Sequence, residues 1–271
     1  MGAVHAGQGA ANAKSYDLVL VHGLTNKYKW SDSFLDACLR AHGSGHVFVI
    51  YTTGSDRTWT RGIGGRTLMC AGEDSFGAGD AGISDQVAYM KSKIEILQSR
   101  YRLSKPFSII GHSMGGLVSR QYAYQNPNMV ADIVTLGTPH HGSQLAYDME
   151  WAGLFIGASA AMRDLRPDFV DGSFNRMFPV KGIQFANDGK LYTIRGDSDG
   201  WDTCGAIPVV CELFVGYWWL KDVYGFDNDG MVPHYSGIIG GAVDLYQFWG
   251  YDHYHLISES AVAVKALSVL R

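Results

Sequence analysis

Short apolar runs recur along the chain, and segments with apolar side chains at helical spacing separate them. Runs of this length bounded by turn residues are typical of buried strands. The sequence predicts strands at residues 17–21, 46–51, 106–110, 130–136, 191–195 and 243–248. It predicts helices from Ser84 to Tyr101, from Met114 to Gln125 and over residues 257–270. Strands that alternate with helices indicate a mostly parallel sheet with helices on both faces.

Two stretches interrupt this rhythm. Residues 52–82 are rich in Gly, Thr and Ser and are interpreted as a long loop. Residues 144–180 hold mostly helical, apolar pieces, and we interpret them as a cap or lid inserted into one domain that spans residues 1–271. The apolar part of this insertion, residues 149–161, either covers a site or packs as a helix on the body of the domain.

Charge and apolar patterning argue against nucleic-acid binding and against a membrane span. The formal net charge of the 271 residues is −4, so the chain has no basic footprint for nucleic acid. No uninterrupted apolar run reaches the roughly 18 residues of a membrane span. The first 14 residues lack the pattern of a secretion signal, so the chain is either cytoplasmic or begins after a removed signal.

Four cysteines leave the pairing open. The short spacing between Cys204 and Cys211 favours a local bridge, which would leave Cys38 with Cys70. Four buried thiols are the alternative, because disulfides follow oxidising compartments.

The strongest chemical motif follows the strand at residues 106–110. There the chain reads Gly111-His112-Ser113-Met114-Gly115, which is G-x-S-x-G between a strand and a helix. A serine at such a turn is held in a strained backbone with its hydroxyl exposed, and small residues two positions away avoid collisions. We therefore predict Ser113 as a nucleophile.

Acyl transfer also needs two backbone N–H groups directed at the developing oxyanion. The residue after the nucleophile, Met114, would supply one of them. The other is expected from the loop after the first strand, where Gly23 permits a sharp turn and Leu24 would be the donor.

A serine nucleophile requires a histidine base and a carboxylate that orients it, in the chain order serine, acid, histidine. The histidine is expected after the last strand, and we predict His255, with His253 as the alternative. For the acid we predict Asp229, in a tight turn before that strand. Asp227 is the nearest alternative. The Asp-rich loop adds three more candidates: Asp197, Asp199 and Asp202.

Taken together, these motifs resemble bacterial true lipases of the Pseudomonas and Burkholderia type, with related esterases and polyester depolymerases. The segments that carry the resemblance are VLVHGLTNKYKW, GHSMGG, LGTPHHGS, DNDGMVP and the closing HL. The resemblance implies an α/β-hydrolase fold, a lipase or esterase activity, and a triad of Ser113, Asp229 and His255 with Leu24 and Met114 as oxyanion donors. Such enzymes are typically secreted, which supports secretion of this chain and bridged cysteines.

The resemblance has one departure. Lipases of this type usually hold calcium close to an Asp two positions after the catalytic histidine, and that position is Ile257 when His255 is the base. We therefore expect no metal and no cofactor. His140 and His141 are interpreted as supports of the loop beside the site, because no third ligand lies near them in the sequence.

The expected partner is a small-molecule or lipid ester, with a polymer surface as a further candidate and contact with a lipid interface. The alternatives are a polyhydroxyalkanoate or polyester depolymerase and a catalytically silent binding protein on the same fold.

Overall fold

The computed structural model describes residues 14–26, 28–151, 158–200 and 212–271. Within them an eight-stranded sheet has the order β3-β4-β2-β1-β5-β6-β7-β8. The strands are β1 (Leu18–Val21), β2 (Val47–Ile50), β3 (Thr58–Ile63), β4 (Arg66–Ala71), β5 (Phe107–His112), β6 (Val130–Leu136), β7 (Leu191–Asp197) and β8 (Val243–Trp249). Every neighbouring pair is parallel except β3 and β4. The prediction of a mostly parallel sheet is confirmed.

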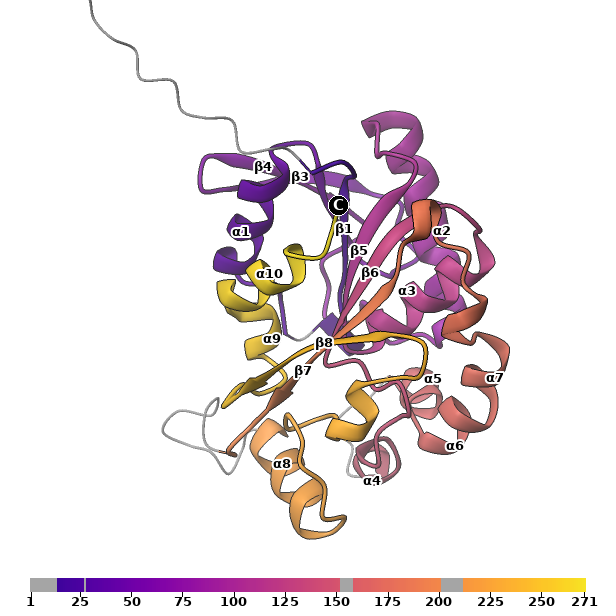
Figure 1. Cartoon of the computed structure of the whole chain (residues 1–271), viewed down its shortest axis with the longest axis vertical. Coiled ribbons are helices and arrows are strands. Elements are labelled where there is room, and N and C mark those ends of the chain that lie inside the picture. Colours follow the sequence, from indigo (N-terminus) through magenta and orange to yellow (C-terminus); the bar gives the residue numbers. More distant parts are fainter. Residues whose placement is uncertain (1–13, 27, 152–157, 201–211) are drawn as a thin grey trace, which may run out of the picture.

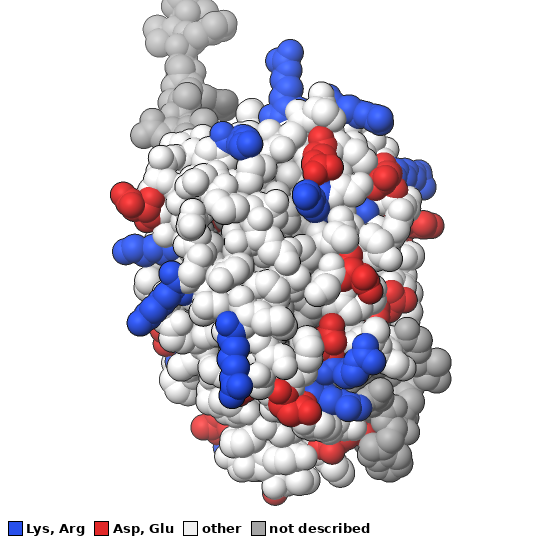
Figure 2. Space-filling model, turned by 90° about the vertical axis from the view of Figure 1, so that its right-hand side faces the viewer, with Lys and Arg blue, Asp and Glu red and all other residues white. Residues whose placement is uncertain are grey.

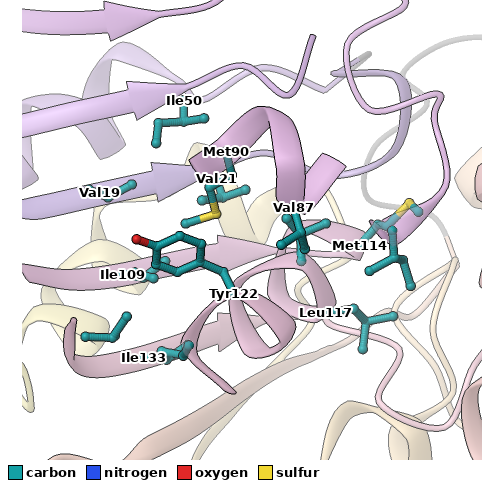
Figure 3. Close-up of a cluster of buried hydrophobic side chains, with 14 of the residues drawn as sticks. Val19, Val21, Ile50, Val87, Met90, Ile109, Met114, Leu117, Tyr122 and Ile133 are labelled. Carbon is teal, nitrogen blue, oxygen red and sulfur yellow. The ribbon is translucent and has the colours of Figure 1, made fainter. Parts of the chain in front are cut away.

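Helices cover both faces of this sheet (Figure 1). On one face lie α1 (Asp32–His42), α9 (His255–Ser258) and α10 (Ser260–Leu267), and on the other lie α2 (Ile83–Tyr101) and α3 (Met114–Gln125). Successive strand residues point to opposite faces, so β1 divides its side chains between two cores. Val19 and Val21 pack with α2 and α3, as Figure 3 shows, while Leu18 and Leu20 pack towards α1 and α10.

The prediction of a loop over residues 52–82 is wrong, because β3 and β4 form an antiparallel hairpin there. Ile63 pairs with Arg66 across Gly64 and Gly65, whose φ angles are 55° and 75°. A two-residue turn with positive φ at both positions is a favoured hairpin connection, and Gly-Gly is one of its signatures. The hairpin lies at the edge of the sheet, where β3 is largely polar and only partly buried.

Two helices differ from the prediction. The helix α1 was not predicted, although Ser31 caps it by accepting a hydrogen bond from Phe34 N–H at 3.1 Å. The predicted closing helix begins earlier and is split into α9 and α10, because Glu259 between them has extended backbone angles.

Short helices fill the segment between β6 and β7. They are α4 (Leu145–Trp151), α5 (Ser159–Asp164), α6 (Pro167–Phe169), η2 (Val170–Phe174), α7 (Asn175–Met177), η3 (Val180–Gly182) and η4 (Ala186–Asp188). Ala158, Ala161 and Met162 are buried in the same core as α2 and α3, so this part of the predicted insertion packs on the body of the domain. Residues 152–157 of the proposed cap lie outside the described residues.

Three further elements complete the described chain: η1 (Leu24–Asn26), α8 (Glu212–Asp222) and η6 (His234–Gly237). In the described ranges, no helix is both long and apolar enough to cross a membrane. Figure 2 shows basic and acidic side chains scattered together over one face of the molecule.

The cysteine prediction is wrong for one pair. Cys38 and Cys70 are free and buried, so they do not form the bridge expected between them. Burial raises the pKa of both thiols, that of Cys70 to about 12. Cys204 and Cys211 lie outside the described residues.

Candidate active site

Ser113 lies at the sharp turn between β5 and α3, as the motif predicts. Its φ and ψ angles are 53° and −129°, a conformation that costs free energy for any residue except glycine. The Ser113 N–H donates to the Leu136 carbonyl at 2.8 Å, which ties the strained turn to β6. The side chain borders an apolar pocket. The backbone therefore holds the hydroxyl at the pocket wall at the expense of local strain.

The glycines around Ser113 are required by close packing. A Cβ on Gly115 would lie 2.3 Å from the His22 carbonyl oxygen, and one on Gly111 would lie 2.8 Å from the Gly115 carbonyl oxygen. A Cβ on Gly23 would lie 2.7 Å from the Ser113 Cβ. The loop after β1 therefore packs directly on the nucleophile turn.

A buried carboxylate and a buried imidazole face each other beside this turn. The Asp229 Oδ2 atom lies 2.8 Å from His253 Nδ1, and both side chains are at most 4% exposed. The Oδ1 atom of Asp229 accepts hydrogen bonds from Met231 N–H at 3.0 Å and Val232 N–H at 2.7 Å. Because a carboxylate only accepts, Nδ1 of His253 carries the proton and Nε2 is left as a base. His253 lines the same pocket as Ser113.

The choice of His255 as the base is corrected by this geometry. His255 is the first residue of α9, and its Nδ1 lies 2.9 Å from Asp252 Oδ1. The same oxygen accepts the His255 and Tyr254 N–H groups at 2.9 Å, so Asp252 caps the helix and holds His255 there. His255 is neither paired with Asp229 nor among the residues that line the pocket.

Two of the alternative acids have other partners. Asp227 forms a surface ion pair with Lys221, which lowers the pKa of its carboxyl. Asp197 lies 3.0 Å from His234 Nε2. Asp202 is outside the described residues. Asp229 is thus the candidate that the structure brings together with Ser113 and a histidine.

The two expected oxyanion donors lie at the start of helical turns. Met114 is the first residue of α3, where N–H groups have no partner within the helix. Leu24 is the first residue of η1 and lines the pocket with Gly23 and Ser113. Their predicted role fits these positions.

The pocket is mainly apolar. Besides the residues above, its wall includes Leu145, Ala146, Met162, Leu165, Met231 and Val232. Much of this wall comes from α4, α5 and the turn that carries Asp229. The site therefore presents a serine and an imidazole to a ligand with an apolar portion.

Comparison with known proteins finds a matching domain family and similar lipases. Residues 72–171 match the family model described as PGAP1-like alpha/beta domain. A triacylglycerol lipase from Pseudarthrobacter phenanthrenivorans and one from Burkholderia plantarii are each 30% identical over 139 residues, 49% of this chain. These aligned segments span 36% and 32%, about a third, of the two relatives' own lengths.

Solved structures match nearly the whole chain. The mature Bacillus licheniformis lipase BlEst2 is similar with a TM-score of 0.65 and 20% identity, over 95% of this chain and 91% of that one. Lipase 1 from Pelosinus fermentans is similar with a TM-score of 0.59 and 11% identity, over 94% and 98% of the two chains. This chain has the α/β-hydrolase fold. A metagenomic carboxyl esterase is a further similar structure, with a TM-score of 0.59 and 15% identity, over 98% and 77%.

The described residues do not fit the calcium site that the lipase resemblance implies. With His253 facing Asp229, the position two residues later is His255, whose Nδ1 is already paired with Asp252. No cluster of three or more His, Cys, Asp or Glu side chains suited to a metal occurs in the part of the chain that the structure describes.

His140 and His141 have separate partners. His140 is buried, with Nδ1 at 3.2 Å from Arg120 and Nε2 at 3.0 Å from Thr135 Oγ1. Burial holds the pKa of His140 well below its ordinary value. His141 Nδ1 lies 2.6 Å from Asp171 at the surface.

Two histidines at the site were not predicted from the sequence. His112 is buried, donates from Nε2 to the His253 carbonyl at 3.0 Å, and its ring packs against the His253 ring at a tilt of 45°, with 4.5 Å between the ring centroids. Asp252 could have indicated that His255 is not the base. An Asp three residues before a residue at a helix start is the pattern of a helix cap, which predicts that Asp252 binds the backbone at His255. His22, the other missed residue, contacts the loop that carries Leu24.

Proposed function

We propose that this chain is a serine carboxyl-ester hydrolase of the lipase or esterase type, which acts through an acyl-enzyme on Ser113. The observation that carries the proposal is the buried Asp229–His253 pair beside Ser113 in an apolar pocket. The names of the similar lipases and of the carboxyl esterase support the same reaction class.

The reaction follows from the proton positions. Nε2 of His253 accepts the proton of the Ser113 hydroxyl as Oγ attacks the ester carbonyl carbon. The carbonyl oxygen takes the electron pair and is stabilised by the N–H groups of Leu24 and Met114. Collapse expels the alcohol oxygen, which His253 protonates. Water then attacks the acyl-enzyme with His253 again as base, which releases the acid and restores the Ser113 hydroxyl.

Asp229 has a separate task in this cycle. Its Oδ2 fixes the ring orientation and tautomer of His253 and stabilises the imidazolium that forms after proton transfer. The two backbone donors on Oδ1 hold the carboxylate in place.

The substrate is proposed to carry an apolar acyl chain. Leu145, Met162 and Leu165 offer apolar contacts beside Ser113, and acyl chains gain free energy by leaving water there. The triacylglycerol lipases that this chain resembles make acyl glycerols the first substrates to test. Hydroxyalkanoate polyester belongs in the same panel as the alternative substrate.

Contact with a lipid interface is part of the proposal. Trp219 and Val223 on and beside α8 are 41% and 57% exposed. Aromatic and aliphatic side chains exposed together often mark interaction sites. Comparing rates on monomeric ester and on emulsion at equal acyl chain length tests this part. Secretion, which the resemblance implies, is tested by tracing the protein in culture medium.

The decisive experiment is a rate panel with matched variants. The panel comprises nitrophenyl esters from C2 to C16, a triglyceride emulsion and hydroxybutyrate polymer. The wild type is expected to hydrolyse the esters, and Ser113→Ala to lose on the order of 10⁴-fold or more in kcat.

A comparison of the two neighbouring histidines tests the assignment of the base. His253→Ala should lose a similar factor to Ser113→Ala, whereas His255→Ala should stay within about tenfold of wild type. Loss of activity in His255→Ala with activity kept in His253→Ala would restore the sequence-based choice. An inactive wild type whose Ser113 resists a phosphonate would favour the silent binding protein.

A further inference from the structure

His22 is a buried histidine that takes no part in the proposed proton transfers. It directly follows β1, is 1% exposed, and is not among the residues that line the pocket. Its Nδ1 atom lies 2.7 Å from the carbonyl oxygen of Gly23. That carbonyl belongs to the same peptide unit as the N–H of Leu24. The ring therefore contacts the carbonyl end of the Gly23–Leu24 peptide, whose N–H end is expected to bind the oxyanion.

Neighbouring contacts fix the proton on this ring. Nε2 of His22 accepts the Thr52 N–H at 3.0 Å, so Nε2 carries no proton. Nδ1 must then carry it and donate to Gly23. Burial lowers the pKa of His22 to about 4, which keeps the ring neutral and in this tautomer at neutral pH. The ring thus accepts a hydrogen bond from the Thr52 backbone and donates one to the Gly23 backbone.

The direction of the Leu24 N–H follows from peptide geometry. The Gly23–Leu24 bond is not among the cis bonds of the described residues, and in a trans peptide the C=O and N–H point in opposite directions. With the carbonyl held towards His22 on the buried side, the N–H is turned towards the pocket that Gly23, Leu24 and Ser113 line.

The contacts extend to the second donor through Gln86. The Gln86 side chain is 0% exposed, and its Oε1 accepts from Thr52 Oγ1 at 2.9 Å. Its Nε2 donates to the Gly79 carbonyl at 3.0 Å and lies 3.4 Å from Met114 Sδ. One buried network therefore contacts the carbonyl of the Gly23–Leu24 peptide and the side chain of Met114.

We propose that His22 is a positioning residue for ester hydrolysis: by donating from Nδ1 to the Gly23 carbonyl, it aims the Leu24 N–H at the oxyanion. This inference rests on the proposed function. His22 touches neither substrate nor reacting atoms, so its effect is confined to steps in which the ester carbonyl carbon becomes tetrahedral and its oxygen becomes negative. Substrate affinity in the ground state is left unchanged.

The test compares three substitutions at position 22. In His22→Asn, the amide nitrogen lies close to the position of Nδ1 and can still donate to Gly23. His22→Leu fills the space without a donor, and in His22→Gln the amide is one bond further out. We expect kcat on nitrophenyl butyrate to fall about 10- to 100-fold for Leu and Gln with KM unchanged, which is less than the roughly 10²- to 10³-fold cost of losing a whole donor. Asn should stay within about fivefold of wild type.

A transition-state analogue separates positioning from general damage. Butylboronic acid forms a tetrahedral adduct with an active serine, and one of its oxygens occupies the oxyanion position. The inhibition constant should rise across the variants by the same factor as kcat/KM falls. His42→Leu is the matched control, because His42 is also buried and bonds a backbone carbonyl, that of Tyr16 at 3.1 Å, far from Ser113 in the fold. It should lose stability and keep kcat.

Gly79→Ala provides a test that leaves His22 in place. A Cβ there would lie 2.6 Å from the Gly23 carbonyl oxygen and 3.1 Å from His22 Cε1, so it would displace the same hydrogen bond. It should reproduce the matched changes in kcat and boronate inhibition.

The inference is overturned if folded His22→Leu or His22→Gln keeps wild-type kcat, or if kcat falls while boronate inhibition is unchanged. If neither variant folds, full activity in Gly79→Ala overturns it. A wild type inactive on every ester, with Ser113 unreactive, would instead remove the proposed function and this inference with it.

Discussion

Replacing Asp229 with asparagine should invert the proton arrangement of His253 with almost no change in shape. The two oxygens of Asp229 are not equivalent: Oδ1 accepts from the N–H groups of Met231 and Val232, and Oδ2 faces His253 Nδ1 at 2.8 Å. An asparagine must keep its oxygen at Oδ1, since its amide there would oppose two donors. Its NH₂ group then faces Nδ1, which must become an acceptor, and the proton moves to Nε2.

The cost follows from losing the base. With Nε2 protonated, His253 cannot accept the proton of Ser113, and a triad whose histidine is held in the wrong tautomer loses about 10⁴-fold in kcat. That factor corresponds to about 5.5 kcal/mol of activation free energy. The assay is the steady-state rate on nitrophenyl butyrate, with circular dichroism and thermal unfolding to confirm that the variant is folded.

Asp252→Asn is the matched control for this prediction. Asp252 is also a buried carboxylate bound to a histidine and to backbone N–H groups, but its partner is His255. It should keep kcat within about fivefold of wild type while losing some stability at the start of α9. The reasoning is refuted if Asp229→Asn is folded and retains more than a tenth of wild-type kcat.

Two further predictions concern packing and pH. Gly115→Ala should lower the free energy of unfolding by about 1–3 kcal/mol, because its Cβ would lie 2.3 Å from the His22 carbonyl oxygen. Gly172 has open space around it, so Gly172→Ala is the control and should leave the free energy of unfolding in urea nearly unchanged. Burial lowers the folded-state pKa of His22 to about 4. Unfolding therefore takes up a proton below about pH 6.5. Between pH 7.5 and 5, the free energy of unfolding of the wild type should fall by about 2 kcal/mol more than that of His22→Asn. Equal losses would contradict the buried neutral state.

Local patterns were sufficient for the elements that lie wholly inside the sheet. The runs at β1 and β2 are apolar at every position, and β6 is apolar except at Asp132 and Thr135, because both faces of a parallel sheet are covered. This leaves a strong signal. The edge hairpin was missed for the same reason. β3 is only partly buried, so its sequence carries polar residues, which favoured the interpretation as a loop.

The strained turn at Ser113 was predictable because the residue types that it requires are contiguous in sequence. Ser113 lies between Gly111 and Gly115, where a Cβ would collide with neighbouring backbone. The histidine partner of Asp229 was not predictable, because the choice between His253 and His255 depends on which ring reaches Asp229, 24 residues before His253 in the chain. Order along the chain permits both, and only the fold brings one of them to the carboxylate.

The buried guanidinium of Arg120 has a consequence for redesigning the apolar pocket beside Ser113. Arg120 lies on α3, contacts His140 Nδ1 and Asn175 Oδ1, and stacks over the Phe174 ring at 4.7 Å. Arg120 thereby holds α3, the helix that follows Ser113, against the segment at Phe174 and Asn175. Met162 and Leu165 line the pocket and are not among these contacts of Arg120. Libraries that enlarge these two side chains and keep Arg120, His140 and Asn175 constant should therefore change the preferred acyl chain length without displacing Ser113.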